Sequence, residues 1–109
     1  MNTYTIRLTI GHDVKGVRTF KTRDVCEYVR AYLHVHAFTA FDCLGMWEGQ
    51  SESSTRVELC GLTKEEADAI REEVPVLAMA LAQNSIMCET RPDAVEFVEA
   101  ETIAAQKTA

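Results

Sequence analysis

The sequence predicts a single α+β domain, with an antiparallel sheet and two helices. A chain of 109 residues can build one core but is too short for two ordinary domains. Its content of 47% hydrophobic and 26% charged residues is typical of a globular protein. Segments with the two-residue period of a strand also alternate with segments of helical period. We expect this domain to span residues 1–99, followed by a flexible tail at residues 100–109.

The first strand and the first helix are predicted from residues 3–33. "TYTIRLTI" (3–10) alternates strictly between apolar and polar residues, as a half-buried strand does. "GHDVKGVR" (11–18) has the composition of a turn. A helix is expected from Thr22, with Asp24 and Glu27 as a possible capping box. Its apolar face consists of Val25, Tyr28, Val29, Tyr32 and Leu33.

A β-hairpin is expected next. "AFTAFDCLGMW" (37–47) is dense in aromatic and small apolar residues, which predicts a strand with both faces partly covered. "EGQSESS" (48–54) contains one glycine and three serines and is interpreted as the turn. "STRVELC" (54–60) alternates again and forms the second strand of the hairpin.

The second helix carries the clearest local signal in the chain. Thr63 and Glu66 have the spacing of a capping box, and Leu62 and Ala67 that of a hydrophobic staple. Pro75 predicts a kink or a break between two helices, because proline removes a backbone hydrogen bond. The apolar stripe consists of Ala67, Ile70, Val74, Leu77, Ala78 and Leu81.

After the second helix, "IMCET" (86–90) reads as a strand closed by "RPD", and "AVEFVEA" (94–100) as a possible extra strand. The order of elements is therefore strand, helix, strand, strand, helix, strand. This is the βαββαβ order of a ferredoxin-like sandwich, in which two helices cover one face of an antiparallel sheet. The other face is left for solvent or a partner.

Charge and composition limit the classes of partner. The net charge is −6, yet residues 1–30 hold six Lys and Arg residues against three acids. We expect no nucleic-acid binding from an acidic domain. The basic residues could form a weak anion site or simply a solvated surface: Lys15, Arg18, Lys21 and Arg23.

The expected location and redox state follow from the lack of a membrane-spanning segment and of a signal peptide in the sequence. No apolar run approaches a membrane span, and the alternating N-terminus is unlike a signal peptide. We therefore expect a cytoplasmic protein that does not bind membranes. The four cysteines are widely spaced, which favours free core residues over the alternative of disulfides.

His34 and His36 are the only candidate metal ligands. On a strand, residues two apart project to the same side, so both imidazoles could reach one ion. The alternative is that these residues lie at a helix C-terminus, where imidazolium complements the exposed carbonyl groups. We predict at most weak metal binding there, and no cofactor.

No catalytic motif is recognisable, and "GQSES" lacks the second glycine of a nucleophile elbow. The sequence therefore favours a small acidic protein that binds another protein without catalysis, such as a phage or mobile-element inhibitor that blocks a host surface.

The alternative is an oligomeric sensor that binds a nucleotide or metal between subunits, because the order of elements is similar to that of PII-like and CutA-like regulators. A homo-dimer or homo-trimer is expected. The candidate partner-binding residues are Met46, Trp47, Glu65, Asp68, Glu72 and Glu73.

Overall fold

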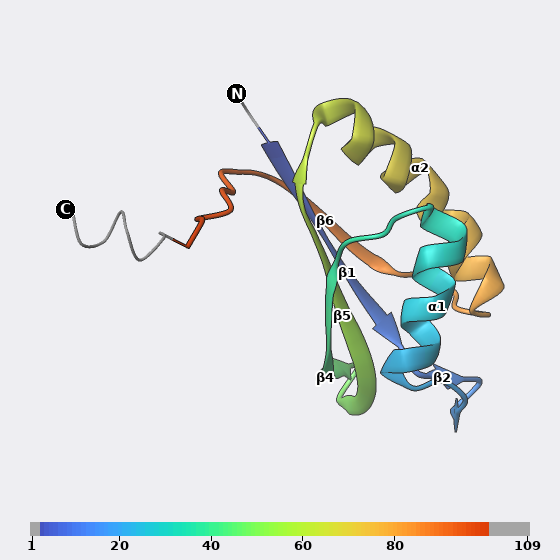
Figure 1. Ribbon diagram of the computed structural model, residues 1–109. Helices are drawn as coiled ribbons and strands as arrows, with labels where there is room; N and C mark the ends of the chain where they lie inside the picture. The colour runs from blue at the N-terminus through green and yellow to red at the C-terminus, as the bar shows by residue number, and fades with distance from the viewer. Residues whose placement is uncertain (1–2, 101–109) are drawn as a thin grey trace, which may run out of the picture.

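The computed structural model describes residues 3–100, which form a four-stranded antiparallel sheet with both helices on one side (Figure 1). The elements are β1 (Thr3–Gly11), β2 (Asp13–Val14), β3 (Val17–Arg18), α1 (Thr22–Leu33), β4 (Thr39–Trp47), β5 (Gln50–Leu62), α2 (Lys64–Ala80) and β6 (Met87–Asp93). The strand order across the sheet is β4-β5-β1-β6, and β2 pairs only with β3. The prediction of an α+β fold with an antiparallel sheet and two helices is confirmed.

The core lies between the sheet and the two helices. Alternate residues of β1 turn toward the helices, so that Ile6, Leu8 and Ile10 are fully buried. The neighbouring strand β5 adds Val57 and Leu59 to the same cluster. The helices contribute Val25, Val29, Leu33, Ala67, Ile70, Val74, Leu77 and, just after α2, Leu81.

α1 begins at Thr22, as predicted, but its capping box differs from the prediction. The helix begins at Thr22 with Lys21 as its N-cap, and the backbone N–H of Lys21 donates to Asp24 Oδ2 at 3.0 Å. Asp24 is therefore the third helical residue, and its carboxylate accepts the hydrogen bond from the N-cap residue. The prediction of a capping box between Asp24 and Glu27 was wrong. The carboxylate still lies in the first turn, where the helix dipole favours it.

The capping box of α2 is confirmed. Thr63 Oγ1 accepts from the Glu66 N–H at 3.1 Å, and Glu66 Oε1 accepts from the Thr63 N–H at 2.9 Å. Pro75 lies inside one continuous helix from Lys64 to Ala80, so it does not divide α2 into two helices. Its ring is exposed on the outer side of α2, where it displaces no core side chain.

The hairpin between β4 and β5 is much tighter than predicted. The turn consists only of Glu48 and Gly49, and the stretch interpreted as a turn mostly belongs to β5, which begins at Gln50. Both turn residues have positive φ angles, 49° and 78°, as two-residue hairpin turns require. Pairing with β4 along the whole serine-rich segment, and with β1 at Ser54, holds it extended despite its composition.

Three further expectations are corrected. β4 is an edge strand with exposed apolar residues, not a strand covered on both faces. The predicted loop at 11–18 contains the short hairpin of β2 and β3. At the other end, Arg91, Pro92 and Asp93 belong to β6, and residues 94–100 form no strand but run away from the sheet (Figure 1). Residues 101–109 of the predicted tail lie outside the described residues.

The four cysteines are free, as predicted, but none is a buried core residue. Cys26, Cys43 and Cys88 are half-buried, and Cys60 is exposed. Burial raises the pKa of the Cys26 and Cys88 thiols. Within residues 3–100, no helix is long and apolar enough to cross a membrane.

Candidate functional site

The candidate site lies on the open face of the sheet, opposite the helices. The side chains of β1 and β5 that do not enter the core meet on this face in cross-strand pairs. Arg7 Nε lies 3.0 Å from Glu58 Oε2, and Arg56 Nη2 lies 3.4 Å from Glu89 Oε2. These ion pairs keep the centre of the open face polar.

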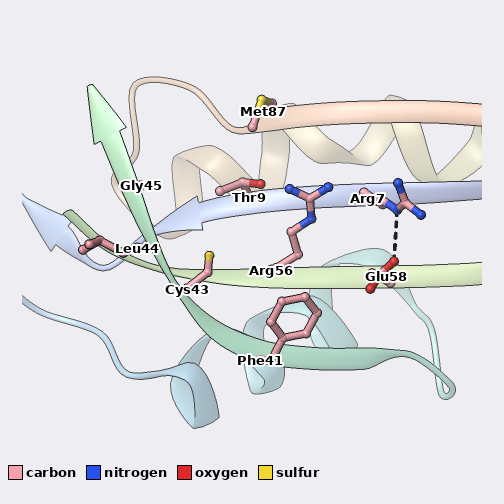
Figure 2. Close-up of a pocket in the computed structure, with 9 residues that line it drawn as sticks. All are labelled: Arg7, Thr9, Phe41, Cys43, Leu44, Gly45, Arg56, Glu58 and Met87. Atoms are coloured by element: carbon pink, nitrogen blue, oxygen red, sulfur yellow. Dashed lines mark hydrogen bonds and ion pairs between the residues drawn. The ribbon is translucent and has the colours of Figure 1, made fainter. Parts of the chain in front are cut away.

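A shallow depression of about 440 Å³ lies on this face. Figure 2 shows Arg7 and Arg56 beside one another in it, with Phe41 near Arg56 and Met87 near Thr9. We call it the open-face pocket, and it is lined by Arg7, Thr9, Phe41, Cys43, Leu44, Gly45, Arg56, Glu58 and Met87. Its arginines are already neutralised by Glu58 and Glu89, so it offers little free charge to a ligand.

A second hollow, of about 450 Å³, lies at the end of the sheet where the β4–β5 hairpin turns. It shares Thr9, Gly45 and Met87 with the open-face pocket, so the two are continuous. We call it the hairpin-end cleft. It is lined by Thr9, Gly11, Asp13, Lys15, Gly45, Met46, Trp47, Glu52, Ser54, Ala82, Gln83, Asn84, Ser85 and Met87.

Glu52 is fixed in this cleft by the last residue of β1. A Cβ atom at position 11 would lie 2.5 Å from Glu52 Oε2, so only glycine leaves room for the carboxylate against the β1 backbone. The backbone N–H of Asp13 also donates to Glu52 Oε2 at 3.2 Å. The carboxylate is thus held in place while it lines the cleft.

Charges of both signs meet in the cleft. Asp13 and Glu52 supply carboxylates, and Lys15 supplies an ammonium group from the turn between β2 and β3. Arg18 lies 3.3 Å from Asp13 Oδ1 and donates to Ser53 Oγ at 2.8 Å, which ties the small hairpin to β5. The cleft is therefore suited to a ligand that carries both an anionic and a cationic group.

A buried polar chain lies behind the cleft. His12 is 3% exposed, and its Nε2 lies 2.6 Å from Thr55 Oγ1. Thr55 is 2.8 Å from the Thr22 hydroxyl, which donates to Asp42. Burial is the main cause that lowers the pKa of His12, and the charge of Arg18 acts in the same direction. The carboxylates of Asp42, Asp13 and Glu52 oppose this shift only in part, so the neutral imidazole is favoured. This chain fixes the junction of β1, α1, β4 and β5.

The structure brings some of the predicted site residues to this cleft. Met46 and Trp47 line it, as does Lys15 from the predicted anion group. The rest of that group is dispersed: Arg18 is paired with Asp13, Lys21 caps α1, and Arg23 lies within α1. Sequence reasoning missed Gly11, Glu52 and Gln83.

The predicted metal ligands and the acidic residues of α2 lie elsewhere. His34 ends α1 with a left-handed backbone, at a φ angle of 55°, and lines a groove with His36, Glu72 and Glu73. Among residues 3–100, no group of three or more His, Cys, Asp and Glu side chains could hold a metal ion. Metal binding by the two histidines stays a prediction, and so does partner binding by Glu72, Glu73 and the exposed residues Glu65 and Asp68.

Comparison with known proteins identifies the fold. No protein-family model and no curated protein matches the chain. Among solved structures, a phage SAM lyase in its apo state matches with a TM-score of 0.70 and 20% identity, over 93% of this chain and 92% of that chain. A phage SAM lyase in complex with S-methyl-5'-thioadenosine matches with a TM-score of 0.62 and 20% identity, over 83% of this chain and 81% of that chain. The chain therefore shares the fold of these proteins.

These matches correct the functional prediction. A non-catalytic interaction domain, and with it the alternative of a nucleotide or metal sensor, was expected because no catalytic motif is recognisable. That expectation is wrong by this comparison, since the structures that share the fold over most of the chain are those of an enzyme. A motif search could not have found this, because none of the described residues that line the cleft is a cysteine or histidine of the kind that marks a nucleophile motif.

Proposed function

We propose that this protein is an enzyme that cleaves S-adenosylmethionine at the hairpin-end cleft and releases S-methyl-5'-thioadenosine. The observation that carries the proposal is the likeness to phage SAM lyase over 93% of the chain. The composition of the cleft supports it, because S-adenosylmethionine carries a carboxylate, an ammonium group and a sulfonium. We assign the ammonium group to Glu52 and the substrate carboxylate to Lys15.

The chemistry of a lyase explains why such a cleft needs no nucleophile of its own. A lyase adds no water, so the bond that replaces the broken C–S bond must form within the substrate. In one balanced route, a carboxylate oxygen of the substrate attacks its own Cγ, and the S–Cγ bonding pair moves to sulfur. The products are a γ-lactone and the neutral thioether S-methyl-5'-thioadenosine.

The surroundings of the cleft favour this reaction. The anionic carboxylate and the cationic sulfonium neutralise one another as the bond forms, so a site with little water accelerates the step. Met46, Trp47 and Met87 supply apolar walls. The remaining contribution is orientation, because the carboxylate must lie behind the S–Cγ bond.

The test is product formation from S-adenosylmethionine by the purified full-length protein. We expect S-methyl-5'-thioadenosine to form well above the rate without protein, and no oxygen to enter the other product from heavy-oxygen water. Glu52→Gln is expected to lower kcat/KM by about 10- to 100-fold, the effect of losing one charged contact to the substrate. Glu65→Gln, an exposed carboxylate on α2, is the matched control. A rate equal to that without protein rejects the proposal.

We also propose that the fold is ferredoxin-like in the strict sense. The elements other than the β2–β3 hairpin follow the order βαββαβ, and β5 lies between β4 and β1 in the sheet. The expected homo-oligomer stays a proposal as well. The exposed apolar residues Phe41, Leu44 and Met46 along the edge strand β4 support it, and mass by light scattering tests it.

A further inference from the structure

Trp47 is an apolar wall of the hairpin-end cleft to which no particular part of the ligand has yet been assigned. It is the last residue of β4, pairs with Gln50 across the two-residue turn, and is 76% exposed. Tryptophan combines a large apolar face with one N–H donor and is therefore common at binding sites. The tight turn leaves the chain little freedom at this point, so Trp47 is presented on a rigid hairpin and not on a loose loop.

The surroundings of Trp47 are those of a site for a flat ring. Trp47, Met46 and Met87 form the apolar side of the hairpin-end cleft. Gln83, Asn84 and Ser85, which follow α2, supply hydrogen-bonding side chains to the same cleft. A purine fits both features of the cleft, because its faces are apolar and its edge carries hydrogen-bonding groups.

Gln83 gives the site a preference among purines. Its Nε2 donates to the Asp13 carbonyl oxygen at 3.0 Å and to the Leu81 carbonyl oxygen at 3.3 Å. With its amide protons engaged in this way, the group that Gln83 can offer a ligand is the carbonyl oxygen, an acceptor. An acceptor suits the amino group of adenine and opposes the carbonyl group that hypoxanthine carries in its place.

We propose that Trp47 stacks on the adenine ring of the ligand and that Gln83 accepts a hydrogen bond from its amino group. This inference rests on the proposed function for the identity of the ligand as an adenine nucleoside. Trp47 then contributes affinity for the ring, and Gln83 determines the preference for adenine. Stacking of a base on an aromatic side chain corresponds to roughly a fivefold to hundredfold change in affinity.

The test uses Trp47 as its own reporter, since the chain has a single tryptophan. Titration with S-methyl-5'-thioadenosine is expected to change the tryptophan fluorescence in a saturable way. Adenosine should produce the same change, and inosine should need about tenfold more ligand or fail. No change of fluorescence with S-methyl-5'-thioadenosine overturns the inference.

Variants measured by calorimetry separate stacking from other effects. Trp47→Ala is expected to weaken S-methyl-5'-thioadenosine binding by about tenfold or more, while Trp47→Phe keeps most of the affinity. Met79→Ala removes another highly exposed apolar side chain, on α2, and serves as the control. Binding by Trp47→Ala within twofold of the unaltered protein overturns the inference. A fall in mass by light scattering for Trp47→Ala also overturns it, because Trp47 would then pack against a second copy.

The inference and the proposed function fail in different ways. If adenosine and S-methyl-5'-thioadenosine bind at Trp47 but S-adenosylmethionine yields no product, the stacking role holds and the lyase proposal is rejected. If product forms and Trp47→Ala leaves KM unchanged, the lyase proposal holds and the stacking role is rejected.

Discussion

The two faces of the sheet are made by alternate residues of the same strands, yet they differ in almost every physical property. On the covered face, Ile6, Leu8 and Ile10 are fully buried against two helices. Arg7 and Thr9 alternate with these residues along β1 and lie on the open face. Arg7 forms an ion pair with Glu58, and both residues line the open-face pocket. The covered face therefore supplies stability, and the open face is free to carry chemistry. The following predictions test that division, from the largest expected effect to the smallest.

Leu8→Ala should have the largest effect on stability. Leu8 is fully buried in the middle of β1, and truncation of such a side chain costs about 2–5 kcal/mol of unfolding free energy. Thr9→Ala, one residue along on the open face, should change that energy by less than about 0.5 kcal/mol. Urea unfolding followed by circular dichroism measures both. Equal losses would show that the two faces do not differ in the way described.

Gly11→Ala should reduce activity more than stability. The new Cβ would displace the Glu52 carboxylate, which can move at a cost of about 1 kcal/mol because it ends a flexible side chain. The rate at which S-methyl-5'-thioadenosine forms should fall by about tenfold or more, which is the loss expected for Glu52→Gln. The double variant with Glu52→Gln should be no slower than Glu52→Gln alone, because both changes act on one group. An additive loss would show that Gly11 acts in some other way.

His12 makes the junction behind the cleft sensitive to pH. Because burial holds the pKa of His12 below its usual value of 6.5, the unfolded chain takes up a proton in a range where the folded chain does not. This contribution to stability is fully present above pH 6.5 and is lost as the pH falls through that value toward the lower pKa of the folded state. His12→Gln should flatten the fall in unfolding free energy between about pH 7.5 and about pH 5.5.

His34→Gln is the control for that measurement, since His34 lies at the end of α1, away from the buried chain. The comparison separates the contribution of His12 from that of an exposed histidine outside this chain of side chains. A variant at His12 with an unchanged slope would contradict the role assigned to its neutral imidazole.

Glu58→Gln should have the smallest effect. The ion pair with Arg7 is partly exposed, and pairs of this kind contribute about 0–1 kcal/mol, less at high salt. Unfolding in low and high salt should show a smaller difference for the variant than for the unaltered protein, because the variant lacks only this one of the ion pairs. A loss above about 2 kcal/mol would mean that the open face contributes to stability as the covered face does.

The fold was predictable where the signal is local. The alternation of residues 3–10 and the Thr63–Glu66 capping box depend on neighbours in the sequence, and both are found in the structure. The start of β5 was missed because its serines favour a turn, whereas pairing with β4 and β1 imposes an extended chain.

The site was less predictable for the same reason. Trp47 was singled out by its residue type and position, but the contact between Gly11 and Glu52 joins segments that are distant in the sequence. Gln83 lies between the predicted second helix and the strand predicted at 86–90, in a segment to which no role was assigned. The side chains that line the cleft come from segments far apart in the sequence, so no short motif joins them.

The outer edge of β4 has a consequence for the handling of the protein. Within the part of the chain that the structure describes, no strand pairs with this edge of nine residues, and it contains neither proline nor lysine. Its only charged residue, Asp42, is engaged by Thr22. Proteins usually guard such an edge with charge, proline or a bulge, because unpaired backbone groups are a template for another strand. This molecule therefore has little to oppose strand-by-strand aggregation in concentrated solution.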